Sequence, residues 1–216
     1  MLDTKVEKNG LTFYGTFSEG FFEEWLKILN VLPSKERIQD GLLLQVGFSI
    51  YKLVQLNMDQ FRIMSVNYEK NSFKEFTDDL TLALWIQGEQ SRLVKELDIE
   101  ASDIRFDEKI VLAKGVFESD HYYLQRQDID KKGDSGWFIG YQNQDTAGFV
   151  SIYAFEILKM NPKLIKVLIL PANYLVVVNG GDIQTILNEQ DEEIFQLHKV
   201  TQLVWERKVT YFRFFS

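Results

Sequence analysis

The residues whose types could take part in a reaction lie in one short segment, Gly133 to Gly140, where Ser135 directly follows Asp134. A hydrolase serine needs a positioned histidine that takes its proton. The chain contains two histidines: His121 is fourteen residues upstream on an expected strand, and His198 is in a charged segment expected to be helical. We therefore predict that Ser135 is a turn residue, that no hydrolase activity depends on it, and that the protein is not an enzyme.

Two groups of carboxylates could bind a cation or a basic partner. Asp128, Asp130 and Asp134 have loop spacing but lack the twelve-position calcium pattern with its closing glutamate. We predict a solvated acidic loop there, with no metal and no cofactor. The second group is Glu189, Asp191, Glu192 and Glu193. It is typical of a solvated helix start, and recognition of a basic patch on a partner is the alternative.

Arg126 carries the most specific expectation of all the charged residues. An arginine in an apolar strand often reaches a carboxylate through two parallel hydrogen bonds. Asp134 is eight residues further on, across an expected hairpin. We predict an Arg126–Asp134 pair that fixes the loop, and the alternative is an arginine that contacts a ligand. Trp137 is expected in the core, although tryptophan and arginine also dominate interface energies.

The segment around these residues combines a shaped loop with an aromatic strand. Its glycines permit a positive φ or a close approach of the backbone, and its Asp and Ser side chains can accept hydrogen bonds from nearby amides. Trp137 and Phe138 would place large apolar side chains on opposite faces of a strand. The candidate binding or motif residues are Arg126, Asp134, Ser135, Gly136, Trp137, Phe138 and Gly140.

The elements that position these residues follow from the hydrophobic pattern. In the first half, residues 42–56 alternate with a period of two, with mostly apolar even positions, which predicts one strand with one face on the core. We expect further strands at Leu11–Phe17 and Phe61–Tyr68, with a turn at Asn57–Gln60. One helix is expected from an N-cap at Ser18 to Pro33, and another from Thr77–Asp79 to about Leu97, with Gly88 packed closely or breaking it.

The second half follows an acidic connector, residues 97–107, without the composition of a flexible linker, so we expect the halves to touch. A hairpin turn is expected at Asn179–Asp182, and Asn161-Pro162 should open a short helix. The other expected elements are a short apolar run at Ile110–Ala113, strands at His121–Arg126, Trp137–Tyr141 and Tyr174–Val178, a helix near Ser151–Met160, and a β-prone aromatic segment at Arg207–Phe215.

Composition excludes several classes of function. The chain has 216 residues, 45% hydrophobic and 14% aromatic, so it can bury a sizeable core. It has no cysteine and no visible leader or apolar span, so we expect a cytoplasmic protein. The net charge is −8, and no basic cluster exceeds Lys131-Lys132, so we expect neither nucleic acid nor membrane as a partner. A basic protein partner would be steered toward this chain.

Several runs in the second half resemble a known family. They are Ile110-Val111-Leu112-Ala113-Lys114, Tyr122-Tyr123-Leu124-Gln125-Arg126, the tetrapeptide Asp134-Ser135-Gly136-Trp137 with Phe138-Ile139-Gly140, Asn161-Pro162-Lys163-Leu164-Ile165, and Leu170-Pro171. In this order and spacing they resemble family thirty-three of the predicted immunity proteins of bacterial polymorphic toxin systems, formerly a domain of unknown function. The resemblance covers roughly residues 104–195. The stretch Gln142-Asn143-Gln144-Asp145 departs from it by being less acidic, and the first hundred residues lie outside it.

The resemblance implies an α+β fold, no established catalytic activity, and cytosolic neutralisation of a cognate toxin by binding. We therefore expect two packed halves, each a mostly antiparallel sheet with helices on one face. The expected domains are 1–100, of unknown family, and 104–216, immunity-protein-like. The alternative function is a small-molecule or peptide-binding module, with a pocket lined by Arg126, Asp134, Ser135 and Trp137.

The aromatic residues near the C-terminus could serve a contact of their own. They are Tyr211, Phe212, Phe214 and Phe215. We expect them to cover the sheet internally or to form a homodimer edge. Contact with the toxin is the alternative, because they offer more aromatic area than one edge strand needs.

Overall fold

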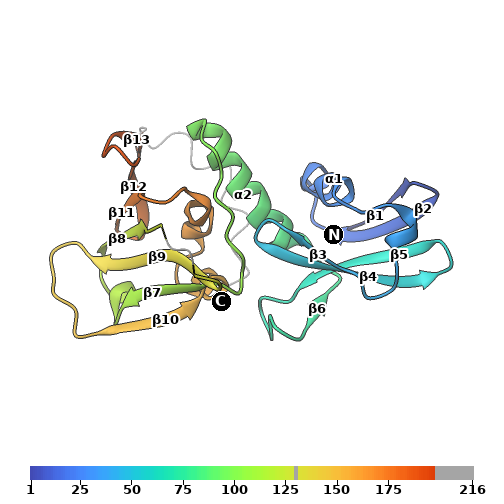
Figure 1. The fold of residues 1–216 in the computed structure, drawn as a ribbon, viewed down its shortest axis with the longest axis horizontal. Coiled ribbons are helices and arrows are strands. Elements are labelled where there is room, and N and C mark those ends of the chain that lie inside the picture. Colours follow the sequence, from blue (N-terminus) through green and yellow to red (C-terminus); the bar gives the residue numbers. More distant parts are fainter. Residues whose placement is uncertain (129–130, 198–216) are drawn as a thin grey trace.

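The computed structural model describes residues 1–128 and 131–197 and has an α+β fold with two sheet-containing halves. Figure 1 shows helix α2 (Thr81–Leu97) between the two sheets. Both sheets are mostly antiparallel, each with one parallel pair of strands. The predicted fold class is therefore confirmed. No helix in the described ranges is long and apolar enough to cross a membrane.

The N-terminal sheet has six strands in the order β1-β2-β5-β4-β3, with β6 paired to β5. Its strands are β1 (Leu2–Lys8), β2 (Leu11–Phe17), β3 (Leu43–Val46), β4 (Ser49–Asn57), β5 (Gln60–Val66) and β6 (Phe76–Thr77). The predicted strand at β2 and the turn between β4 and β5 are confirmed. The helical elements of this half are α1 (Phe22–Asn30) and the 3₁₀ helix η1 (Lys35–Arg37), followed by α2.

The long alternating run, residues 42–56, is two strands and not the single strand that was predicted. The backbone turns at Gly47, where φ is +53°, and β3 and β4 pair with each other as a hairpin. The turn also exchanges the faces of the run. The odd positions Ser49, Tyr51 and Leu53 are buried in β4, whereas the even positions beside them are half-buried. The predicted antiparallel pairing with the next strand is confirmed for β4 and β5.

Both helices of this half begin later than predicted. The chain turns at Gly20, where φ is +96°, so α1 starts at Phe22 and the Ser18 amide donates to Thr81 Oγ1 (3.0 Å) and does not cap α1. Residues 76–77 pair with β5 as β6, which delays α2 to Thr81. Helix α2 continues unbroken through Gly88, where an added Cβ atom would lie 3.6 Å from the Glu24 side chain of α1.

The C-terminal sheet has seven strands in the order β10-β7-β9-β8-β11-β12-β13. They are β7 (Lys109–Ala113), β8 (His121–Arg126), β9 (Asp134–Tyr141), β10 (Phe149–Tyr153), β11 (Leu175–Asn179), β12 (Asp182–Leu187) and β13 (Glu193–Gln196). The helical elements are η2 (Val116–Glu118), η3 (Ala154–Glu156), α3 (Ile157–Met160) and η4 (Pro162–Ile169). The predicted strands at β8, β9 and β11 and the turn between β11 and β12 are confirmed, and the short apolar run at Ile110–Ala113 forms most of β7.

Two predictions in this half are contradicted by the structure, and a third lies outside the described residues. The helix predicted near Ser151–Met160 is wrong over its first part, because residues 149–153 pair with β7 as the edge strand β10. The acidic group, residues 189–193, does not begin a helix: it turns between β12 and β13, with Asn188 Oδ1 accepting hydrogen bonds from two of its amides. The segment Arg207–Phe215, with its four aromatic residues, and His198 lie outside the described residues.

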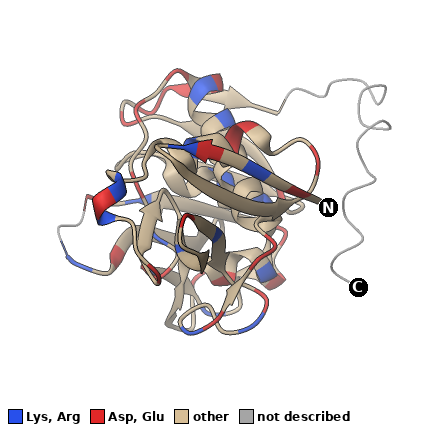
Figure 2. Cartoon of the chain, turned by 90° about the vertical axis from the view of Figure 1, so that its right-hand side faces the viewer, with Lys and Arg blue, Asp and Glu red and all other residues tan. Residues whose placement is uncertain are grey.

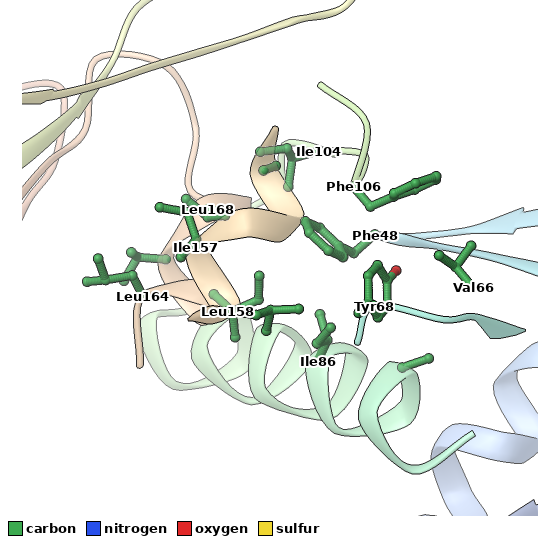
Figure 3. Close-up of a cluster of buried hydrophobic side chains, with 14 of the residues drawn as sticks. Phe48, Val66, Tyr68, Ile86, Ile104, Phe106, Ile157, Leu158, Leu164 and Leu168 are labelled. Carbon is green, nitrogen blue, oxygen red and sulfur yellow. The ribbon is translucent and has the colours of Figure 1, made fainter. Parts of the chain in front are cut away.

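The two halves share one hydrophobic core, as the predicted contact between them requires (Figure 3). Phe48 and Tyr68 come from the N-terminal half, and Leu158 and Leu168 come from α3 and η4 of the C-terminal half. The connector joins the same core through the buried side chain of Phe106. The Phe106 amide also donates to the Phe48 carbonyl at 3.0 Å. The division into domains 1–100 and 104–216 remains a prediction.

Candidate functional site

The tetrapeptide Asp134-Ser135-Gly136-Trp137 opens β9 as a hydrogen-bonded turn. The Gly136 amide donates to Asp134 Oδ1 (3.1 Å), and the Trp137 amide donates to Ser135 Oγ (3.2 Å). Ser135 Oγ in turn donates to the Lys109 carbonyl of the neighbouring strand at 2.6 Å. These bonds confirm that both side chains fold back onto nearby amides. The serine hydroxyl is used as a donor to the neighbouring strand and so joins β9 to β7.

Gly136 is required by its conformation and by its surroundings. Its φ is +76°, a region that residues with a side chain rarely adopt. A Cβ atom at this position would lie 2.3 Å from the Gln127 carbonyl oxygen. That close approach allows the Gln127 amide to donate to the Gly136 carbonyl at 2.8 Å. The glycine therefore lets the end of β8 and the start of β9 lie against each other.

Arg126 donates to five backbone carbonyls, and its predicted pair with Asp134 is wrong. Nε reaches Ser135 O (3.1 Å), and Nη2 reaches Asp103 O (2.9 Å). The acceptors of Nη1 are Ser102 O at 2.9 Å, Leu170 O at 2.7 Å and Leu168 O at 3.4 Å. Arg126 follows the buried alternation of β8, so its side chain enters the inner side of the sheet, while Asp134 bonds its own turn.

The Arg126 cation is buried without an ion pair to a carboxylate among the described residues. Burial lowers the pKa of Arg126, and the charges of Glu108 and Asp103 act in the opposite direction. Burial also raises the pKa of Glu108, against the effect of its hydrogen bond from the Arg105 amide. Carbonyl dipoles replace water around the guanidinium and so stabilise the buried charge. Because these carbonyls belong to the connector, β9 and the end of η4, Arg126 joins the three segments.

Trp137 belongs to the core, as predicted. Its side chain is buried, and Nε1 donates to the Leu168 carbonyl at 2.9 Å, the same oxygen that Arg126 Nη1 approaches. The guanidinium lies 6.0 Å from the centre of the indole ring. The structure thus brings Arg126, Ser135, Gly136 and Trp137 together, whereas Phe138 faces the other side of the sheet, as its strand position predicts.

A pocket of about 410 Å³ lies beside Arg126. Its wall includes Arg126, Asp134 and Ser135, three of the four residues predicted to line such a pocket, but Trp137 is not part of it. The lining mixes both signs of charge: Arg105, Arg126, Lys131 and Lys132 with Asp103, Asp107, Glu108, Asp128 and Asp134. Arg105 is already paired with Asp107 at 2.6 Å. The pocket is polar and carries no dominant charge.

The described residues do not assemble a hydrolytic or metal-binding arrangement around Ser135. His121 Nδ1 lies 2.9 Å from Asn179 Oδ1, and the serine hydroxyl is bonded to Lys109. No group of three potential ligands among His, Cys, Asp and Glu lies together in the part of the chain that the structure describes. Asp130 and His198 fall outside that part.

Sequence reasoning missed several polar contributors. Ser102, Asp103, Leu168 and Leu170 act through backbone carbonyls, for which no side-chain signal exists. Asn161 was predicted only as a cap, and its side chain does accept from the Lys163 amide. It also donates to two further oxygens, Tyr122 Oη and Gly181 O, both at 2.9 Å.

Together, the α+β fold and this buried polar junction define a protein whose motif residues hold several backbone segments in place. Residues 89–189 match the family model of the Imm33-like domain. The match covers the C-terminal portion and confirms the resemblance found in the sequence, although it begins earlier, within α2. Neither the curated proteins nor the solved structures contain a significant match to this chain.

Proposed function

We propose that this protein is a cytoplasmic immunity protein that neutralises a cognate bacterial toxin by direct binding and without catalysis. The observation that carries the proposal is the match of residues 89–189 to the Imm33-like domain. The match includes Arg126 and the tetrapeptide at the start of β9, which the structure joins by hydrogen bonds. An immunity protein needs a stable surface of defined shape, and this junction supports one.

The side chains that could react already have hydrogen-bond partners within the protein, which supports a binding role. The hydroxyl of Ser135 and the imidazole of His121 each have a different hydrogen-bond partner. Arg126 uses its donors on backbone carbonyls. Side chains held in this way are suited to stabilising a fold.

The charge of the chain supports a basic partner. The net charge is −8, and Figure 2 shows acidic and basic residues interspersed, without one large basic patch in that view. A long-range field of this sign accelerates encounter with a basic protein, while buried apolar contacts control dissociation. Association with the toxin should therefore slow as salt concentration rises.

The pocket beside Arg126 favours a second candidate, a small-molecule or peptide-binding module. Its volume, about 410 Å³, suits a small ligand. Among the described residues, Arg126 Nη2 makes one hydrogen bond, to Asp103 O, and a guanidinium NH₂ group has two N–H donors. Because Arg126 lines the pocket, a ligand acceptor there is the partner that this candidate assigns to the second N–H.

Co-expression with the toxin tests the proposal and separates it from the second candidate. The probe is the toxin domain encoded beside the gene of this protein, expressed with and without the full chain. We expect restored growth, and an equimolar complex with a catalytically inactivated toxin. Killing that is equally efficient with and without the chain would contradict the proposal. Ala172→Trp would fill the pocket; loss of protection by this variant, with folding intact, would instead favour the pocket as the site.

A further inference from the structure

The C-terminal sheet has one face on the core and an opposite face that is rich in apolar side chains. Paired strand residues point to the same side of a sheet. The pairs Val111–Phe138, Gln125–Phe138 and Val177–Tyr123 therefore place these side chains on one face, which we call the outer face. Trp137 and Ile139 alternate with Phe138 and are buried on the other side.

The apolar residues of the outer face do not belong to the core. They are Val111, Tyr123, Phe138, Phe149, Leu175, Val177 and Leu187, and within the described ranges none is part of the shared core or packs against it. All are half-buried except Phe149, whose exposed fraction is 61%. A continuous apolar area that no core element covers is typical of an interaction site.

An aromatic stripe on this face uses side chains from β8, β9 and β10 and crosses β7, which lies between β9 and β10. The rings of Tyr123 and Phe138 have centres 6.0 Å apart, and those of Phe138 and Phe149 are 5.7 Å apart. Gly140 makes the stripe possible, because a Cβ atom there would lie 2.6 Å from the Phe138 ring and 2.9 Å from the Tyr123 ring. The glycine of the sequence motif therefore leaves space that both rings occupy over β9.

The stripe ends at an exposed edge. Strand β10 is the last strand of the sheet on this side, and Phe149, Val150 and Ser151 are all exposed. An edge strand also presents backbone donors and acceptors that a partner can use. The outer face thus combines aromatic anchors with a strand edge that no described residue pairs.

Acidic loops flank this apolar area at the ends of the sheet. Glu118 and Asp120 precede β8, and Asp145 precedes β10, with Lys114 nearby in sequence. At the other end the turn between β12 and β13 carries exposed acidic residues, Glu189, Asp191 and Glu192. An apolar centre with a charged rim is the usual composition of a protein interface. The loop before β9, at the same end as the turn between β12 and β13, also carries Lys131 and Lys132, but the acidic residues of this rim outnumber the basic ones, which favours a basic partner.

We propose that the outer face, centred on Tyr123, Phe138 and Phe149, is the surface that binds the toxin, and that the toxin contributes an apolar patch with basic residues around it. This inference rests on the proposed function. It assigns the contact to the face opposite the Arg126 junction. Within the sequence motif, Gly136 and Trp137 then stabilise the fold, whereas Phe138 and Gly140 shape the interface.

Two variants on the exposed edge test the surface without altering the core. Phe149→Glu replaces an aromatic anchor by a charge, and Ser151→Arg adds bulk and a positive charge that a basic partner repels. Phe22→Glu is the matched control, because Phe22 is 45% exposed and lies on α1 in the other half. We expect the first two to raise the dissociation constant for inactivated toxin by about 30-fold or more, and the control to bind as the wild type does.

The outcomes separate this inference from the proposed function. If the wild type binds the toxin and both edge variants bind equally well, the outer face is the wrong surface and the immunity function stands. If the wild type does not bind or protect, the proposed function fails and the inference with it. A wild-type dimer that Phe149→Glu converts to a monomer, with toxin binding unchanged, would assign the face to a second copy of the chain.

Hydrogen exchange provides a measurement that needs no variant. We expect the amides of residues 149–153 to gain protection when the full chain binds inactivated toxin. Equal exchange in free and bound protein would contradict the proposal. If truncation after Leu197 increases exchange of the same amides in the free protein, the chain's own C-terminal residues occupy the face, which would also contradict it.

Discussion

The two halves of the molecule differ in how they accommodate buried polar atoms. Among the described residues, three buried side-chain atoms have no hydrogen-bond partner: Trp25 Nε1, Tyr51 Oη and Gln87 Oε1. All three lie in the N-terminal half or face it. In the C-terminal half, Arg126, Ser135 and Trp137 are buried and hydrogen-bonded to backbone carbonyls. Within the shared core, the N-terminal part is defined mainly by apolar packing, and the C-terminal part also by a polar network.

This difference explains why a short motif is visible in one half only. An apolar position accepts several side chains of similar volume. A buried polar position accepts few, because losing a partner leaves the other group unsatisfied. Arg126 and the tetrapeptide around Ser135 are therefore specific in residue type, and residues 89–189 match a family model. Four sets of substitutions would break or sharpen the comparison.

Arg126→Met should have the largest effect. It removes the donors from five carbonyls that the side chain holds at 2.7–3.4 Å. We expect the free energy of unfolding to fall by about 4 kcal/mol in denaturant titration. Arg105→Met is the control, because that side chain is exposed and paired only with Asp107, and it should cost less than about 1 kcal/mol. Equal losses for the two variants would contradict the structural role of Arg126.

Gly136→Ala should follow in magnitude. The new Cβ atom would meet the Gln127 carbonyl at 2.3 Å, in a backbone conformation with φ of +76°. We expect a loss of about 3 kcal/mol in the free energy of unfolding. Gly133→Ala separates the two causes, since Gly133 has a φ of +85° but no atom within 4 Å of the added Cβ. It should cost only about 1 kcal/mol.

The two buried tryptophans compare the halves directly. Trp137 Nε1 donates to Leu168 O, whereas Trp25 Nε1 has no partner in the structure. Tryptophan to phenylalanine removes similar apolar area at each site. We expect Trp137→Phe to cost about 1 kcal/mol more than Trp25→Phe, because only the first breaks a buried hydrogen bond. Thermal and denaturant unfolding of both variants would measure the difference, and a larger cost at Trp25 would contradict the comparison.

Glu108→Gln should give the smallest effect, visible as a dependence on pH. Burial raises the pKa of the folded-state carboxyl above its ordinary value of 4.5. Stability from this group is therefore fully present below that value and is lost as the pH rises through the folded-state pKa. Relative to the variant, the wild type should be most stable at acidic pH and less so toward neutrality. A difference that is constant between pH 4 and 7 would contradict the shift.

Sequence patterns predicted most of the elements that position the site. The bounds of β2 and β8 agree with the expected strands, and Asn161-Pro162 opens η4. These elements have local signals: β-forming residues, alternation, and a proline at the first helical position. The same signals placed Trp137 in the core and Phe138 on the opposite face.

The wrong predictions arose where an alternating pattern fitted more than one strand arrangement, or where a charged residue had more than one possible partner. Apolar residues at all but one of the even positions from Leu42 to Leu56 concealed the turn at Gly47, which exchanges the two faces. Asp134 was a plausible partner for Arg126 by spacing, but the acceptors are carbonyls from residues 102, 103, 135, 168 and 170. Those oxygens come together only in the tertiary structure, so sequence spacing could not identify them.

The shared core around α2 has a consequence for how the molecule unfolds. Gln90 on α2 donates to the Ile165 carbonyl of η4 at 3.1 Å, while Glu24 of α1 packs against Gly88 on the same helix. Unfolding of either half would expose apolar side chains of α2 to water, and the other half packs against the same helix. The two sheets should therefore behave as one cooperative unit, with a single calorimetric transition whose enthalpy matches the van't Hoff value.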